Sequence, residues 1–273
     1  MGIKFRLIVM NFLQYAIWGS WLISLGAYLG GGLDFTGLQI GSFFATMGVA
    51  SLFMPAVMGI IADRWIPAQK LLGICHLVSG GFLIAAASQT AYGPLYSCML
   101  LSVMFYMPTI ALSNSVAYNA LDLAKLDTVK HFPPIRVWGT VGFIAAMWFV
   151  DLTHIGGVQI KLTEWQLYVS AVLSFLLAVY SFSLPGCPVD RNVKARSWVD
   201  TLGLRAFTLF KEKRMAIFFV FSMLLGAALQ ITNAFGDSYI QSFGSMPQYA
   251  DSAIVKHSVI LLSLSQMSET FCI

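Results

Sequence analysis

Long apolar runs, separated by short polar, glycine-rich or proline-rich segments, dominate the chain. A membrane-spanning helix needs about 20 mostly apolar residues. On this rule the runs predict membrane spans over residues 5–29, 37–61, 69–90, 93–120, 133–152, 165–184, 214–239 and 252–273. Turn or charge signals bound all of these spans except the last, which reaches Ile273 without a charged flank. We therefore expect a truncated chain or a fragment.

The composition supports a polytopic membrane protein. Of the 273 residues, 58% are hydrophobic and 10% are charged, whereas soluble domains have about 25% charged residues. The net charge of +4 is spread over short loops, so we expect no nucleic-acid partner. The cysteines stand alone, without the spacing of a metal site or a disulfide framework, at Cys75, Cys98, Cys187 and Cys272. We expect no metal and no cofactor.

Lysine and arginine residues alternate with the predicted spans. They gather before the first span and after the second, fourth and sixth, whereas the alternate loops contain only Lys161 and Lys256. The positive-inside rule then places the N-terminus in the cytoplasm. The long basic segment 185–213 separates a six-helix part, 1–184, from 214–273. This layout is typical of transporters with two six-helix halves, although an unrelated polytopic protein with a domain boundary here has the same pattern.

The segment Phe132–Phe143 places an arginine inside an apolar run. Proline suits the first turn of a helix, so we expect a helix that begins at Pro133. Arg136, Thr140 and Phe143 then lie at i, i+4 and i+7, on one face. A cation, a hydroxyl and an aromatic ring on one face predict the wall of a solute pathway.

A short charged motif follows the second predicted span. Gly59, Asp63 and Arg64 match the Gly-x-x-x-Asp-Arg signature of the major facilitator superfamily at its usual place. There, the glycine permits a close helix approach and the carboxylate can meet a helix N-terminus. A simple charge pair at a helix end is the alternative.

Longer strings carry a more specific resemblance: Gln14–Trp21, Phe132–Phe143, Lys213–Phe219, Leu229–Asn233 and Ser265–Glu269. Together they resemble the bacterial nucleoside:proton symporters of the nucleoside permease G type, within the major facilitator superfamily. The resemblance implies an all-α major facilitator fold, here truncated to the N-terminal six-helix half plus about two helices of the second half. It also implies solute contacts from Arg136, Thr140, Phe143, Gln230, Asn233, Gln266 and Glu269. Ala228 departs from the family pattern, where we expect a carboxylate.

The polar residues of the last two predicted spans also pair by spacing. Gln230 and Asn233 share a helix face, as do Gln266 and Glu269. Amides offer both donors and an acceptor, the mixture that ribose hydroxyls and base edges require. Hydrogen bonds between helices are the alternative role for such amides. Gln230 lies about 24 Å beyond Arg214 along a straight helix, which leaves its depth relative to Arg136 open.

Glu269 and Arg136 are the charged candidates. A charge at mid-bilayer normally faces a cavity or a partner. Glu269 lies about 27 Å along a helix from Asp251, in the cytoplasmic half of the membrane, where we also expect Arg136. We therefore predict a proton-coupling role for Glu269, with Arg136 setting its pKa. Alternatively, Arg136 extends to the lipid headgroups and Glu269 lies near a helix end.

Other polar residues have structural interpretations. His76 is expected to be a hydrogen-bonded packing histidine, and Asp237 to be solvated near an outer helix end. Asn114 and Asn119 either line the pathway or hold helices together. No nucleophile–base pair, phosphate-binding loop or zinc spacing occurs in the sequence, so we do not expect an enzyme.

The sequence thus predicts a monomeric symporter of the bacterial inner membrane. It would take up purine and pyrimidine nucleosides with protons by alternating access. A proton symporter for another polar solute, such as a sugar, and a non-transporting receptor of the same fold are the alternatives.

Overall fold

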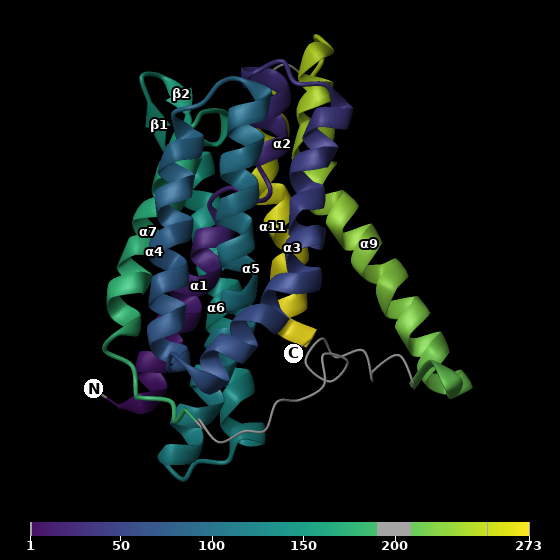
Figure 1. Cartoon of the computed structure of the whole chain (residues 1–273). Helices are drawn as coiled ribbons and strands as arrows, with labels where there is room; N and C mark the ends of the chain where they lie inside the picture. The colour runs from purple at the N-terminus through teal and green to yellow at the C-terminus, as the bar shows by residue number, and fades with distance from the viewer. Residues whose placement is uncertain (1, 190–208, 250, 273) are drawn as a thin grey trace.

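The computed structural model describes residues 2–189, 209–249 and 251–272, without the side chains of residues 269–272. The described part is a bundle of helices with one small hairpin (Figure 1). The longer helices are α1 (Ile3–Gly19), α3 (Gly37–Arg64), α4 (Ala68–Ala87), α5 (Tyr92–Leu123), α6 (Thr128–Leu152), α7 (Trp165–Ser181), α9 (Lys213–Ser242) and α11 (Ser258–Cys272). This arrangement confirms the expected all-α membrane fold.

Most predicted spans fall on helices of suitable length. Among the described residues, 5 helices are long and apolar enough to cross a membrane. They contain most of the predicted spans 37–61, 69–90, 93–120, 133–152 and 214–239. The helix α7 is shorter, with 17 residues. The last predicted span is divided at His257 into α10 (Ala253–Lys256) and α11.

The first predicted span, 5–29, is wrong as a continuous helix. α1 ends at Gly19, and the chain continues through a turn into α2 (Leu25–Ala27) and a π-helical turn, Tyr28–Gly32. The Ser20 hydroxyl donates to the Ala16 carbonyl at 2.8 Å. Such a local side-chain bond competes with the helix ladder, which explains why the helix ends within an apolar run.

The start of α6 also differs from our expectation. The helix begins at Thr128, not at Pro133, because the Asp127 side chain caps it and accepts from the Val129 N–H at 2.9 Å. Pro133 and Pro134 therefore lie inside the helix. The predicted face of α6 is unaffected, because the residues after the prolines keep their helical spacing.

Two glycines bring α1 and α6 into backbone contact. A Cβ on Gly19 would lie 2.3 Å from the Phe143 carbonyl oxygen, and one on Gly142 would lie 2.2 Å from that of Phe12. Close approach through small residues is a common way to pack membrane helices. It places the polar residues of α6 directly beside α1, which also packs against α5 and α7.

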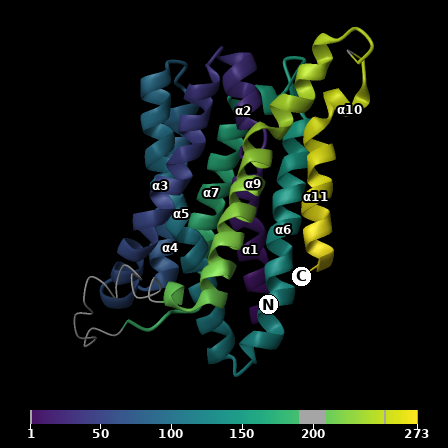
Figure 2. The same ribbon diagram turned by 90° about the vertical axis from the view of Figure 1, so that its right-hand side faces the viewer.

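The two ends of the bundle differ. One end carries the antiparallel strands β1 (His154–Ile155) and β2 (Val158–Gln159), and we call it the hairpin end. The N-terminus lies at the opposite end (Figure 1). α11 packs against α6, as Figure 2 shows. α9 contacts α2 near the hairpin end. Its first half diverges from α3, so that the start of α9 lies apart from the bundle (Figure 1).

Candidate functional site

A cavity of about 200 Å³ lies where α1, α6, α9 and α11 meet. Its wall consists of Tyr15, Trp18, Leu22, Arg136, Thr140, Phe143, Leu229, Gln230, Asn233 and Gln266. The structure therefore brings together every site residue expected from the sequence except Glu269, whose side chain lies outside the described residues. Arg136 and Gln230 line the same cavity.

The α6 wall has the expected face. Thr140 and Phe143 are buried, and Arg136 is partly buried. The Arg136 guanidinium carbon lies 3.8 Å from the centroid of the Tyr15 ring, a cation–π arrangement. Gly139 makes room for this pair, because a Cβ there would lie 2.6 Å from the Tyr15 ring and 2.8 Å from Arg136 Nη1. Arg136 therefore lines the cavity and packs on Tyr15.

The opposite wall carries amides, and the cavity contains two donors without partners among the described residues. Gln230 and Asn233 on α9 and Gln266 on α11 are partly buried. Gln230 Nε2 and the indole Nε1 of Trp18 are buried and have no hydrogen-bond partner among the described residues. Leaving a buried donor unpaired costs about 1–3 kcal/mol. Two such donors in one cavity favour a solute that supplies acceptors.

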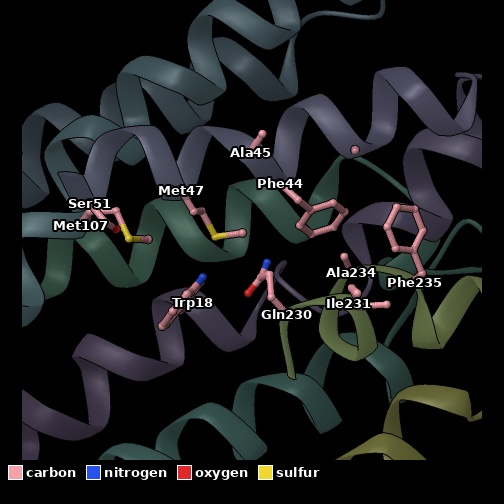
Figure 3. A pocket seen from close by; sticks show the side chains of 12 residues that line it. Trp18, Phe44, Ala45, Met47, Ser51, Met107, Gln230, Ile231, Ala234 and Phe235 are labelled. Atoms are coloured by element: carbon pink, nitrogen blue, oxygen red, sulfur yellow. The ribbon is translucent and has the colours of Figure 1, made fainter. Parts of the chain in front are cut away.

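A second, apolar cavity of about 490 Å³ adjoins the first, and Trp18 and Gln230 line both. Its other walls come mainly from α3 and α9. Figure 3 shows Trp18 and Gln230 next to each other, facing Met47 of α3. A polar cavity beside an apolar one suits a solute with a hydroxyl-rich part and a flat, less polar part.

The charged motif at the end of α3 has a different role from the one expected for its glycine. A Cβ on Gly59 would meet no atom within 4 Å, so the expected close helix approach is wrong for the described residues. Asp63 is exposed. Arg64 lies in the last turn of α3, where a cation interacts favourably with the helix dipole.

His76 is a hydrogen-bonded packing residue, as expected. It is fully buried, and its Nε2 lies 2.8 Å from Gln14 Oε1 while its Nδ1 lies 3.2 Å from the Ser174 hydroxyl. The Gln14 amide in turn donates to Thr109 at 2.7 Å. These bonds join α1, α4, α5 and α7 behind the cavity wall.

Asp237 contradicts our expectation of a solvated carboxylate. It is completely buried and accepts hydrogen bonds from the Ser258 hydroxyl and from Gln241 Nε2, the latter at 2.9 Å. α9 continues beyond Asp237 to Ser242, so this position is inside the helix and is covered by α11.

The two asparagines of α5 differ. The Asn119 amide donates to the Gly186 carbonyl at 3.3 Å, which favours a role in holding segments of the chain together. The side-chain oxygen Oδ1 of Asn114 is buried and has no hydrogen-bond partner among the described residues.

Tyr15 and Trp18 are site residues that the sequence analysis did not identify. Both belong to the string Gln14–Trp21, which served only for the family resemblance. Their spacing of i and i+3 puts two aromatic rings on one helix face. That signal is weak, because aromatic pairs with this spacing are common in helix cores. No group of histidine, cysteine, aspartate and glutamate suited to a metal occurs among the described residues.

Comparison with known proteins identifies the family of the chain. The family model described as "Nucleoside H+ symporter" matches residues 1–273. The chain is 51% identical over 269 residues to the xanthosine permease of Escherichia coli K12, covering 98% of this chain and 63% of that protein. It is 46% identical over 273 residues to the nucleoside permease NupG of the same organism, covering 100% of this chain and 64% of that protein.

Solved structures show the same fold. The crystal structure of nucleoside transporter NupG as its D323A mutant superposes with a TM-score of 0.90 at 46% identity, covering 99% of this chain and 66% of that one. A further NupG crystal structure gives a TM-score of 0.87. The chain thus spans slightly less than two thirds of the length of these relatives. The chain belongs to the nucleoside H+ symporter family.

Proposed function

We propose that the protein takes up nucleosides together with protons across the bacterial inner membrane, by alternating access. The observation that carries this proposal is the cavity itself. It combines a guanidinium, a hydroxyl, three amides and aromatic rings from helices on both sides of the segment 185–213. Relatives named as xanthosine and nucleoside permeases support the choice of solute.

Each wall of the cavity suits a different part of a nucleoside. Gln230, Asn233 and Gln266 offer donors and acceptors that match ribose hydroxyls and base edges. Phe143 packs edge-on against Trp18, with ring centroids 6.4 Å apart, and either ring can stack on a base. Arg136 supplies fixed donors, and Thr140 supplies a hydroxyl that both donates and accepts.

Proton coupling is proposed for Glu269. This residue lies in α11, three positions after Gln266, and so on the same helix face. Gln266 of that face lines the same cavity as Arg136, which supports Glu269 as the coupling carboxylate. A Glu269→Gln variant should exchange nucleosides but should not concentrate them in response to a pH gradient. Retained accumulation would contradict the coupling role.

The orientation and organisation follow from the same proposal. The basic loops favour a cytoplasmic N-terminus, which would put the hairpin end on the periplasmic side. We propose a monomer with an N-terminal half over 1–184, a cytoplasmic connection over 185–213 and a second transmembrane part over 214–273. The motif of Gly59, Asp63 and Arg64 would then lie on the cytoplasmic side. Labelling of single introduced cysteines from either side of the membrane tests this orientation.

Binding and uptake measurements together test the function. Isothermal titration of the purified protein with uridine, adenosine, xanthosine and glucose identifies the solute class. Uptake of labelled uridine by cells that lack their own nucleoside transporters, at pH 5.5 and pH 7.5, tests transport and coupling. Binding of glucose alone would favour a sugar symporter. Nucleoside binding without uptake would favour a receptor.

A further inference from the structure

A buried ionic cluster closes the hairpin end, outside the cavity described above. Lys161, in the turn Ile160–Leu162 before α7, is 1% exposed, and Asp151, in the last turn of α6, is completely buried. Their Nζ and Oδ1 atoms lie 2.6 Å apart. Both residues belong to the part of the chain before residue 184. A buried charge pair inside a membrane protein is a functional candidate by default.

The lysine also reaches across to the other part of the chain. Its Nζ donates to the Lys256 carbonyl at 2.8 Å and to the Ser258 hydroxyl at 3.2 Å. Together with Asp151, these partners use all three ammonium donors. The Ser258 hydroxyl in turn donates a hydrogen bond to Asp237 on α9. A single ammonium group therefore joins the end of α6 to α9, α10 and α11.

Two further bonds cross the same boundary. The Asp151 Oδ2 atom lies 2.7 Å from His257 Nδ1, and the Gln159 amide donates to the Lys256 carbonyl at 3.2 Å. By contrast, none of residues 213–229, in the half of α9 towards the N-terminal end, is buried. α9 leans away from the bundle there (Figure 1). α9 thus meets the first part of the chain at the hairpin end and lies apart from α3 towards the other end, while α11 stays packed against α6.

We propose that this cluster is the gate that closes the hairpin side of the permease, with Lys161 as its key positioning residue. The proposal rests on the alternating access proposed above. Opening towards the hairpin side must break the bonds from Lys161 to Lys256 and Ser258, and those from Asp151 and Gln159 to the α10 region. The Lys161–Asp151 pair lies within one part and stays intact, so Lys161 and Asp151 keep each other as counterions during the cycle.

The gate is connected to the solute cavity through α9. Gln230, Asn233 and Asp237 lie at i, i+3 and i+7 on one face of this helix. Gln230 and Asn233 line the cavity, and Asp237 holds Ser258. A solute that shifts α9 on binding therefore moves Asp237 against Lys161 and its partners. This gives the cavity a direct mechanical link to the gate.

The test measures the gate without requiring transport. Spin labels are placed at Ile155 on β1 and Ile254 on α10, which are 40% and 59% exposed, in a background without the native cysteines. Double electron–electron resonance spectroscopy then measures the distance between the two spin labels across the hairpin end. In the otherwise unchanged protein, we expect the short distance of the closed gate to dominate.

The test variant is Lys161→Met with Asp151→Asn, which removes both charges and leaves neither unpaired. We expect the ratio of short to long distances to fall at least tenfold. The control is Lys256→Met with Asp251→Asn, an ion pair at the same end whose side chains are 53% and 100% exposed. This control should leave the ratio unchanged. An unchanged ratio in the test variant would overturn the gate proposal.

Further variants distinguish a wrong gate proposal from a protein that does not fold or does not transport nucleosides. If the double variant does not fold, as judged by gel filtration, Ser258→Ala removes the bridge to Asp237 while keeping every charge, and it should lower the ratio at least threefold. Lys161→Arg should retain more of the closed population than Lys161→Met with Asp151→Asn. Loss of the closed distance in a protein that does not transport nucleosides would refute the proposed solute and leave the gate supported.

Discussion

Arg136 stacks its guanidinium on the ring of Tyr15, with 3.8 Å between the guanidinium carbon and the ring centroid. This contact fixes a cation at the wall of the cavity, between α6 and α1. Gly139 permits it by leaving the necessary space. The position of the charge therefore depends on a residue of another helix, which makes Tyr15 part of the solute site.

Tyr15→Leu should weaken uridine binding about tenfold, because a partly desolvated cation–π contact is worth about 1–2 kcal/mol. Tyr15→Phe retains an aromatic face and should bind within about threefold of the unchanged protein. Isothermal titration measures both dissociation constants. Equal weakening in the two variants would show that the hydroxyl matters and the ring face does not.

Trp18→Phe should separate binding from stability. The change removes a buried indole donor that has no partner among the described residues, so relief of a cost of about 1–3 kcal/mol offsets the lost ring area. Trp148→Phe instead loses a hydrogen bond to Ser263 of 2.9 Å. Thermal unfolding in detergent should show a smaller loss for Trp18→Phe.

Uridine affinity should change in the opposite order. Trp18→Phe should bind uridine several-fold more weakly, because the cavity loses the indole N–H that donates to the solute. Trp148→Phe should bind uridine with unchanged affinity. Unchanged uridine affinity in Trp18→Phe would contradict the role that we assign to the indole N–H.

Gly142→Ala should separate α1 from α6. The added Cβ would lie 2.2 Å from the Phe12 carbonyl oxygen, and overpacking of this kind costs about 1–3 kcal/mol. Gly81→Ala is the matched control within a helix, because its Cβ would meet nothing within 4 Å, and it should stabilise the protein by about 0.5–1 kcal/mol. Thermal unfolding compares them, and equal effects would argue against backbone contact between the two helices.

The sequence predicted the residues of the cavity better than the boundaries of the helices. Arg136, Thr140 and Phe143 share a face because helical periodicity requires it, and the family resemblance added Gln230, Asn233 and Gln266. The end of α1 at Gly19 depends on the Ser20 hydroxyl, a choice that hydrophobicity does not encode. α6 begins before Pro133 because Asp127 caps it.

The contacts between residues of distant segments were the main feature that could not be predicted from one sequence. Lys161 counted as a loop charge and Asp237 as a solvated carboxylate, yet both are buried at the junction of several helices. Each has one partner nearby in the sequence, Asp151 or Gln241, and one from a later segment, Lys256 or Ser258. Neither residue type nor spacing indicates that these segments meet, so only the packed structure identifies the cluster.

His76→Leu should destabilise the protein without changing its solute preference. The variant leaves the side-chain oxygen Oε1 of Gln14 and the Ser174 hydroxyl without the histidine ring, a loss of about 1–3 kcal/mol in the free energy of unfolding. The control His154→Leu alters an exposed residue of β1 that bonds only to the nearby Leu152 carbonyl among the described residues, and it should change stability by less than about 0.5 kcal/mol. An altered ratio of uridine to adenosine affinity in His76→Leu would indicate a direct role in the site.

Uridine titration of Gln230→Ala tests the convergence of polar side chains on one solute site most directly. Its neighbour Thr232 serves as the control, since it is exposed on α9 and its hydroxyl donates to the Ala228 carbonyl at 3.1 Å. We predict that the unchanged protein and Thr232→Ala bind uridine alike, and that Gln230→Ala binds about tenfold more weakly through loss of buried hydrogen bonds. Identical uridine affinity in all three proteins, or no binding by the unchanged protein, would contradict the account.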